Sequence, residues 1–199
     1  MRYHEPRARA PARTRAGGRA VLPSPPRLPN PLPRTRPPRT PLPGINGAGK
    51  TSTLQILSGD ILPTSGGAQL AGLDIITQQL QVRRLLGYCP QFDAILDLLS
   101  VREHLELYAR IKGVPEPEVR SVVETKLVEM DLKPFENKLA GRLSGGNKRK
   151  LGVANALVGN PPIIFLDEPS TGMDPVARRF MWSVIARVAT ERKQCSIIL

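Results

Sequence analysis

A glycine-rich segment at residues 44–51 constrains the fold of this chain more than any other feature. The segment reads GINGAGKT, which matches the pattern G-x-x-x-x-G-K-[ST] and ends in Lys50 and Thr51. Glycines let the backbone turn its N–H groups inward around phosphate oxygens, and the helix that follows directs its positive end at the same charge. The motif predicts that Lys50 reaches the β- and γ-phosphates of a nucleotide and that Thr51 ligates Mg²⁺. The candidate phosphate ligands are Asn46, Gly47, Ala48, Gly49, Lys50, Thr51 and Ser52.

The segments on either side of this loop differ in what they predict. Leu54 and Leu57 give an apolar side to a helix that follows Lys50, and Gly59 is a helix stop. A phosphate loop normally follows a buried parallel strand. The five residues before Gly44 read RTPLP, in which no strand can be recognised. The first strand of the expected sheet is therefore not predicted from the sequence.

A second candidate site lies at the end of an apolar run at residues 163–166. The run IIFL is typical of a strand covered on both faces, and Asp167 and Glu168 follow it directly. Open α/β sheets bind their ligands at the carboxyl ends of the strands. We therefore expect Asp167 to organise Mg²⁺ and Glu168 to act as the base for an attacking water. Adjacent strand residues face opposite ways, so Glu168 reaches this site only if the chain turns after Asp167, which Pro169 favours.

The first 43 residues differ in composition from the rest of the chain. They hold ten Arg, no Lys, one acid and 12 of the 21 Pro, and so carry +9 of the net charge of +12. Proline at this density prevents helices and interior strands, so we expect a disordered Arg/Pro-rich arm at 1–43 and a folded domain at 44–199. Three interpretations of the arm stay open: a solvated tail, an arm that binds polyanions, and a segment wrongly joined to the domain. Nucleic-acid binding has no further support, because Tyr3 is the only aromatic residue of the arm that could stack on a base.

Composition also bears on the cellular setting. The uninterrupted apolar runs are a handful of residues long, whereas a membrane-spanning helix needs about 20. Cys89 and Cys195 lie far apart and have no CxxC pair or His/Cys cluster nearby. Neither a disulfide framework nor a zinc site is supported, and we expect a reducing, cytosolic environment.

Three further segments are similar to motifs of the ABC ATPases. Residues 143–150 (LSGGNKRK) resemble the signature motif, residues 88–92 (YCPQF) the glutamine loop, and residues 170–175 (STGMDP) the D-loop. With the phosphate loop they follow the order of that family, over Gly44 to Leu199. The sequences LSGGNKRK, GINGAGKTST and SVREHLELYARIKG resemble those of the A subclass, whose full-length members export or flip lipids and sterols.

The resemblance implies a fold and an activity. The fold is α/β, a RecA-like P-loop NTPase with a parallel sheet core and an inserted helical subdomain at about 91–146 that docks on transmembrane helices. The implied activity is ATP binding and hydrolysis with Mg²⁺, by the nucleotide-binding domain of a transporter at the cytoplasmic face of a membrane, with lipid as the expected cargo. Two such domains form a head-to-tail dimer that sandwiches two ATP molecules.

The resemblance also assigns roles to individual residues. Ser144, Gly145 and Gly146 contact the γ-phosphate held by the opposite protomer. A hydroxyl, bare N–H groups and a helix N-terminus form an anion site on physical grounds as well. Gln91 reaches Mg²⁺ and the attacking water. Asp174 has two open roles: the N-cap of the following helix, and a contact across the dimer interface.

The sequence predicts two helices between the glutamine loop and the signature. The capping box SVRE at Ser100 opens a helix that ends near Gly113, and residues 118–130 form the second helix. His104 is expected to be a structural or surface residue. Lys148, Arg149 and Lys150 follow the signature and are expected to form a solvated face of its helix.

Two elements of the family pattern are missing. No aromatic residue that could stack on adenine lies shortly before the phosphate loop, and no switch histidine follows the strand-like run SIIL at 196–199. We therefore expect an ATP-binding domain that is incomplete at both ends. Two alternatives stay open: a soluble ABC-type ATPase of repair or translation, whose basic arm binds nucleic acid, and an inactive truncated fragment.

Overall fold

The computed structural model describes residues 49–92, 94–192 and 195–199. The predicted arm at 1–43, the segment before Gly44, and the candidate ligands Asn46, Gly47 and Ala48 lie outside the described residues. No described helix has both the length and the apolar character that a membrane span requires. In chain order the elements are α1 (Lys50–Ser58), β1 (Gln69–Leu70), β2 (Leu73–Asp74), α2 (Gln79–Leu85), β3 (Leu86–Cys89), α3 (Val101–Ile111), α4 (Glu116–Glu129), η1 (Lys133–Phe135), η2 (Ala140–Arg142), α5 (Gly145–Leu157), β4 (Ile163–Leu166), α6 (Pro175–Glu191) and β5 (Ser196–Ile198).

A parallel sheet with the strand order β3-β4-β5 lies between the helices. Leu86 pairs with Ile163 at one end of the β3–β4 ladder and Cys89 with Leu166 at the other, and Ile164 pairs with Ile197 of β5. The central strand β4 is the predicted apolar run at 163–166, and β5 is the strand-like run near the end of the sequence. Parallel strands need crossover connections, which the helices of this domain provide. The parallel sheet predicted for an α/β fold is therefore confirmed.

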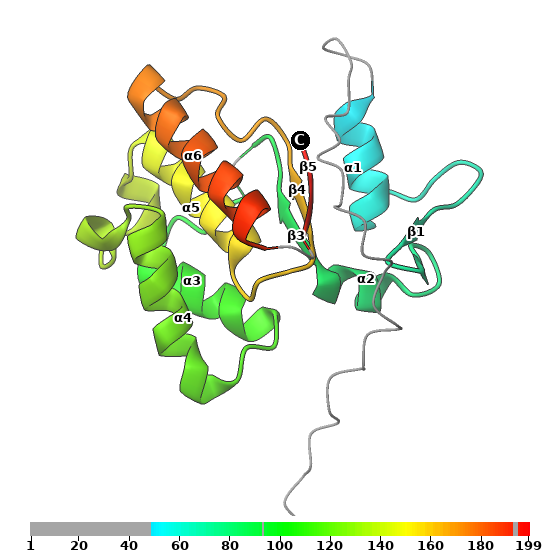
Figure 1. Ribbon diagram of the computed structural model, residues 1–199, viewed down its shortest axis with the longest axis horizontal. Coiled ribbons are helices and arrows are strands. Elements are labelled where there is room, and N and C mark those ends of the chain that lie inside the picture. Colours follow the sequence, from blue (N-terminus) through cyan, green and yellow to red (C-terminus); the bar gives the residue numbers. More distant parts are fainter. Residues whose placement is uncertain (1–48, 93, 193–194) are drawn as a thin grey trace, which may run out of the picture. The chain divides into compact units, whose positions relative to one another are not determined.

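Helices cover both faces of this sheet (Figure 1). On one face Leu54 of α1 packs with Leu86 and Phe165. On the other face α5 and α6 pack on Ile164 and Leu166 in the larger apolar core. Successive side chains of a strand point to opposite faces, which is why the run IIFL is buried by two different sets of helices. It follows that α1 and α5 lie on opposite faces of the sheet.

The contact between α5 and β3 is unusually close at Gly87. A Cβ atom placed on Gly87 would lie 2.0 Å from the backbone oxygen of Ala156, near the end of α5. A hydrogen atom in place of a side chain therefore lets the helix backbone rest directly on the strand. This contact fixes the distance between α5 and the sheet.

The helical segment between β3 and α5 follows the sequence prediction closely. Ser100 accepts a hydrogen bond from the Glu103 backbone N–H, and the Glu103 side chain accepts one from the Ser100 backbone, so the predicted capping box opens α3. The second helix, α4, begins two residues before the predicted start. His104 is fully buried, and its Nε2 accepts a hydrogen bond from the Leu96 backbone N–H at 2.9 Å, which confirms a structural role.

A small antiparallel hairpin follows α1. Its strands β1 and β2 are two residues long and pair Gln69 with Asp74 and Leu70 with Leu73. Ala71 and Gly72 connect them with φ angles of 52° and 78°. Positive φ at both central residues is the conformation of the tight type I′ turn, which matches the twist of the flanking strands.

Candidate functional site

The described part of the phosphate loop is the beginning of α1. Gly49 precedes the helix with φ of 82°, in the left-handed region that favours glycine, and Lys50 is the first helical residue. Gly59 ends the helix in the same conformation, as predicted, and its N–H reaches the carbonyl oxygens of the last turn. The first N–H groups of any α-helix lack partners within the helix. Those of Thr51 and Ser52 therefore lie at the positive end of the helix, where an anion can bind.

The end of β4 places two carboxylates in different environments. Asp167 is 5% exposed, and its backbone N–H donates to the Cys89 carbonyl at 2.9 Å, which closes the β3–β4 ladder. Glu168 follows with φ of 48°, so the chain leaves the strand direction immediately after Asp167. The turn that Glu168 needs in order to face this site is therefore present, as the sequence analysis required.

Asp167 has an unsatisfied oxygen. Its Oδ2 is buried and, within the described ranges, has no hydrogen-bond partner. Buried polar atoms without partners are costly, because they lose their hydration without replacement. Carboxylate oxygens are ligands that Mg²⁺ prefers. The residues at the end of β4 therefore fit a magnesium ion.

The nearby Tyr88 phenol is held neutral. The pKa of Tyr88 is raised to about 12, mainly by burial and secondly by the negative charge of Asp167. A phenol is protonated at physiological pH even at its ordinary pKa of about 10, so this shift strengthens the neutral state and Tyr88 adds no negative charge beside Asp167.

The glutamine loop meets the end of β4 through side chains. Gln91 Nε2 donates a hydrogen bond to Glu168 Oε2 at 3.2 Å, and Thr171 Oγ1 donates to the same oxygen at 3.0 Å. Gln91 and Glu168 are 77 residues apart in the sequence. Two donors from different loops thus orient one carboxylate oxygen. The structure brings together the two residues predicted to act on the attacking water.

The signature residues lie at the beginning of α5. Ser144 is the N-cap and accepts a hydrogen bond from the Asn147 backbone N–H at 3.4 Å. Ser144 and Gly145 are exposed, and a Cβ atom on Gly145 or Gly146 would meet nothing within 4 Å. The positive end of α5 is thus open to a ligand from outside. Because α5 and α1 cover opposite faces of the sheet, the signature residues and Lys50 lie on opposite sides of it.

Asp174 caps α6. Its Oδ1 accepts hydrogen bonds from the N–H groups of Val176 at 3.0 Å and Ala177 at 2.9 Å. The bond from Ala177 is the main reason why the pKa of Asp174 lies below its ordinary value. The capping role is confirmed, and the contact across a dimer interface stays a prediction.

The prediction that the basic residues after the signature are solvated is wrong for two of them. Arg149 is 4% exposed and Lys150 is 8% exposed. Lys150 pairs with Asp131 at 3.0 Å and lies 4.6 Å from the ring centre of Phe180. Arg149 donates to backbone carbonyls of the glutamine loop and of the segment after β4. The one signal in the sequence was the run after Arg149, in which apolar residues occupy all sides of the helix and so indicate burial.

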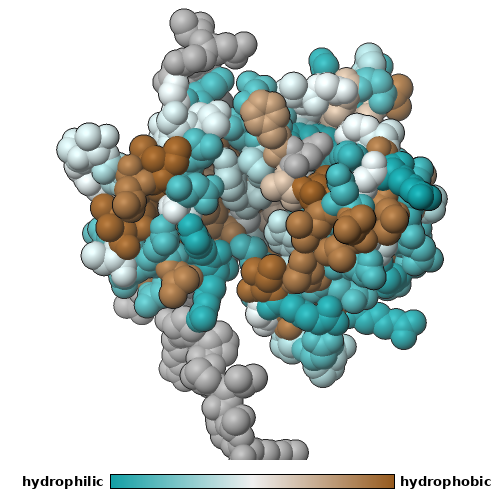
Figure 2. Space-filling view, turned by 180° about the vertical axis from the view of Figure 1, so that it is seen from behind, coloured by the Kyte–Doolittle hydropathy of each residue, from teal (hydrophilic) through white to brown (hydrophobic). Residues whose placement is uncertain are grey.

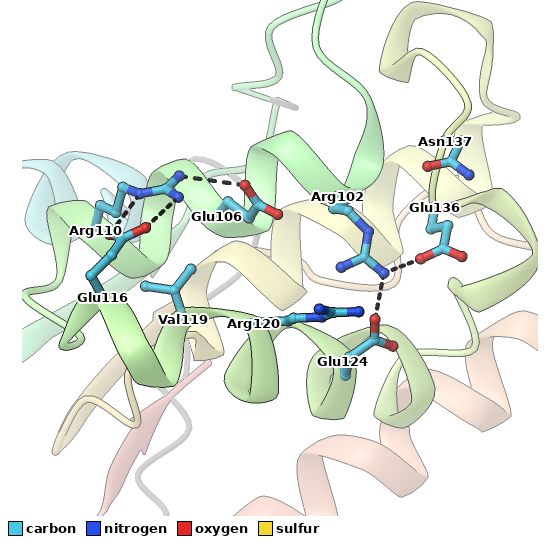
Figure 3. Close-up of a pocket in the computed structure, with 9 residues that line it drawn as sticks. All are labelled: Arg102, Glu106, Arg110, Glu116, Val119, Arg120, Glu124, Glu136 and Asn137. Carbon is cyan, nitrogen blue, oxygen red and sulfur yellow. Dashed lines mark hydrogen bonds and ion pairs between the residues drawn. The ribbon is translucent and has the colours of Figure 1, made fainter.

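A cavity of about 480 Å³ lies elsewhere, between α3 and α4 (Figure 3). Arg102 pairs there with Glu124 and Glu136, and Arg110 pairs with Glu106 and Glu116. These ion pairs lie within α3 (Arg110 with Glu106), between α3 and α4 (Arg102 with Glu124, Arg110 with Glu116), and between α3 and the segment after η1 (Arg102 with Glu136). The cavity contains none of the predicted site residues.

Comparisons with known proteins identify the family of this chain. Residues 37–171 match the ABC transporter family. The chain is 53% identical over 156 residues to the mouse ATP-binding cassette sub-family A member 7. The aligned residues cover 78% of this chain and 7% of that protein. It is 53% identical over 148 residues to the human retinal-specific phospholipid-transporting ATPase ABCA4, which covers 74% of this chain and 6% of that protein. The chain thus spans a small fraction of the length of these relatives.

Solved structures share the fold. The ATP-binding subunit of an ABC transporter superposes with a TM-score of 0.70 and 27% identity, over 79% of this chain and 65% of that chain. A dimeric, post-hydrolysis state of an ATP-binding cassette bound to ADP and Pi also gives a TM-score of 0.70, with 25% identity over 78% of this chain and 71% of that chain. The predicted fold class and the resemblance to the A subclass are both confirmed. The chain belongs to the ABC transporter family, as an ATP-binding domain of the A subclass.

Proposed function

We propose that this domain binds ATP with Mg²⁺ and hydrolyses it by in-line attack of water on the γ-phosphorus, with Glu168 as the base. The observation that carries the proposal is the hydrogen bond between Gln91 and Glu168, beside a buried Asp167 oxygen that has no partner among the described residues. A carboxylate that is oriented by an amide can accept a proton from a water held beside it. Catalysis of this reaction depends mainly on positioning and on stabilisation of charge.

The remaining roles follow from the positions of the residues. Lys50 and the first turn of α1 would bind the phosphates, and Thr51, Asp167 and Gln91 would hold a magnesium ion. The ion, when bound, neutralises charge on the phosphate oxygens. Asn46, Gly47 and Ala48 lie outside the described residues and are predicted from the sequence motif alone to contact the phosphates.

We further propose that two copies of such a domain form the complete site. Ser144, Gly145 and Gly146 would reach the γ-phosphate held by the other domain, which agrees with their exposure and with their position on the face opposite to α1. The similar cassette bound to ADP and Pi is described as dimeric, which supports a partner of the same kind.

The third part of the proposal is a membrane partner. Three large apolar side chains are exposed within the seven residues that follow Gln91: Phe92, Leu96 and Leu98, with exposed fractions of 83%, 55% and 86%. Figure 2 shows that apolar side chains gather in patches on the face that it displays. Exposed apolar patches mark surfaces that contact other proteins. The relatives include a phospholipid-transporting ATPase, so we assign the domain to a lipid transporter, where segment 92–98 contacts the transmembrane part.

The proposal is tested by Glu168→Gln in the full chain. The substitution removes the base but keeps the size of the side chain, so we expect nucleotide binding to persist and hydrolysis to fall by about 10² to 10⁴-fold, the usual contribution of a positioned base. Phosphate release and binding of a fluorescent ATP analogue measure the two effects. Lys50→Ala should lose binding itself.

Glu191→Gln provides the matched control, because Glu191 is exposed at the end of α6. It should hydrolyse ATP at the wild-type rate. A Glu168→Gln variant with wild-type turnover would remove Glu168 from the role of base, and a wild-type chain that binds no ATP in the presence of Mg²⁺ would overturn the proposal.

A further inference from the structure

The buried Arg149 side chain lies where the two catalytic loops meet. Its guanidinium group comes from the second turn of α5 and donates hydrogen bonds to backbone carbonyls of residues that follow β3 and β4. Among the described residues, Nε donates one of these bonds, Nη1 two and Nη2 two, so all three nitrogens of the guanidinium take part. The acceptors are the carbonyl oxygens of Pro90 (2.6 Å), Gln91 (3.1 Å), Asp167, Glu168 (2.7 Å) and Pro169 (3.2 Å).

These carbonyls belong to backbone that needs outside support. Glu168 has φ of 48°, a conformation that costs a residue other than glycine energy and persists only where the surroundings impose it. The turn also directs its carbonyl oxygens away from the ladder of the sheet. The fork of Arg149 binds the carbonyl of Glu168 and those of both neighbours, so it supplies partners on each side of the unfavourable residue.

The support that carries Arg149 is rigid. Helix α5 is buried along most of its length, and its far end lies against Gly87 of β3. The guanidinium is therefore a fixed point, and both loops are attached to it. Their side chains then meet in the hydrogen bond between Gln91 and Glu168.

The geometry points to Arg149 as a positioning residue that holds the glutamine loop and the turn after β4 in register, so that Gln91 and Glu168 keep the arrangement that activates water. This inference rests on the proposed function of that pair. Arg149 acts through the backbone carbonyls of the two loops.

Lysine cannot replace arginine in this position. A lysine ammonium is a point charge with three donors on one atom, whereas the planar guanidinium reaches acceptors in five directions. Arg149→Lys keeps the charge and most of the length, but it leaves carbonyls of at least one loop without a donor. It is therefore a milder test than Arg149→Met, which removes every donor.

The experiment compares Arg149→Lys and Arg149→Met with Lys126→Met in the full chain. Lys126 is also a buried cation, 3% exposed, but it lies on α4 and pairs with Glu129. We expect both Arg149 variants to lower kcat for ATP by about 10- to 100-fold, the order of loss that follows from a displacement near 1 Å, with KM changed less than threefold. Lys126→Met should lower the melting temperature and leave kcat unchanged.

Hydrogen exchange gives a readout that does not require turnover. The amides of Asp167 and Thr171 donate to the carbonyls of Cys89 and Glu168, so they report directly on the two loops. Faster exchange confined to residues 88–92 and 166–172 in Arg149→Lys is the expected result. Exchange and kcat that equal the wild type would overturn the inference, as would faster exchange spread evenly over α3 and α4. Local loosening in a chain whose wild type hydrolyses no ATP would leave the positioning role supported and the proposed function refuted.

Discussion

The close contact at Gly87 makes a quantitative prediction for Gly87→Ala. The added Cβ would lie 2.0 Å from the Ala156 carbonyl oxygen, 2.9 Å from a side-chain carbon of Pro161 and 3.0 Å from the Ala156 carbonyl carbon. Real Cβ atoms essentially never approach closer than 3.0 Å, so β3 and α5 must separate by about 1 Å. Two of the three atoms are backbone, which cannot rotate away as a flexible side chain would.

The expected loss of stability is large for a single methyl group. Forcing extra atoms into a packed core typically costs about 1 to 3 kcal/mol, and a clash with helix backbone places this case at the upper end, about 3 kcal/mol. For a domain of this size, each kcal/mol lowers the melting temperature by about 2 to 4 °C. We therefore expect Gly87→Ala to melt about 6 to 12 °C below the wild type.

Thermal unfolding followed by circular dichroism measures this shift. Gly67→Ala is the matched control, because Gly67 has no atom within 4 Å of its Cβ position. The control should melt within about 2 °C of the wild type. If Gly87→Ala also melted within that interval, the close approach of α5 to β3 would not exist in solution. The separation should also loosen the carbonyl contacts of Arg149, so the variant is expected to lose turnover at temperatures where it remains folded.

Two further predictions concern the signature and the helical segment. Gly146→Ala should fold at least as stably as the wild type, because its Cβ enters open space and alanine favours a helix. The variant should nevertheless lose the ATP-dependent dimer, which light scattering measures. A dimer that persists would contradict the contact with the partner's phosphate. Hydrogen bonds from Lys133 and then Arg102 lower the pKa of Glu124 to about 2, so the stabilisation is complete above the ordinary pKa of about 4.3 and is lost as the pH falls toward 2. In urea titrations the wild type should therefore exceed Glu124→Gln in stability at pH 6 and match it near pH 2, and a constant difference across this range would contradict the cluster.

Structural features that depend on residues close together in the sequence were predicted correctly. The strand at 163–166, the turn after Asp167, the glycine end of α1 and the capping box at Ser100 each follow from a pattern of a few residues, and the structure confirms them. The hydrogen-bond partners of Arg149 could not be predicted in this way. Two of its acceptors are the carbonyl oxygens of Pro90 and Gln91, which are 59 and 58 residues away in the sequence. The other acceptors described above belong to the turn after β4.

Other elements were missed because their local signal is weak. No local pattern predicts β3, although Leu86–Cys89 is a strand of the central sheet. A four-residue apolar run with a glycine inside it does not distinguish a strand from a buried turn. That glycine becomes meaningful only when Ala156 of α5 lies against it. Strands β1 and β2 are two residues long, too short for any period to appear.

The left-handed conformation of Glu168 sets stability and chemistry against each other at one position. Glycine or asparagine would adopt this φ angle at lower energy than glutamate. A screen that selects only for thermal resistance should therefore favour replacements at residue 168 that relax the turn, and each of them would discard the carboxylate. Libraries that aim to stabilise this domain need position 168 held fixed, because the most stable variants found there would be inactive ones.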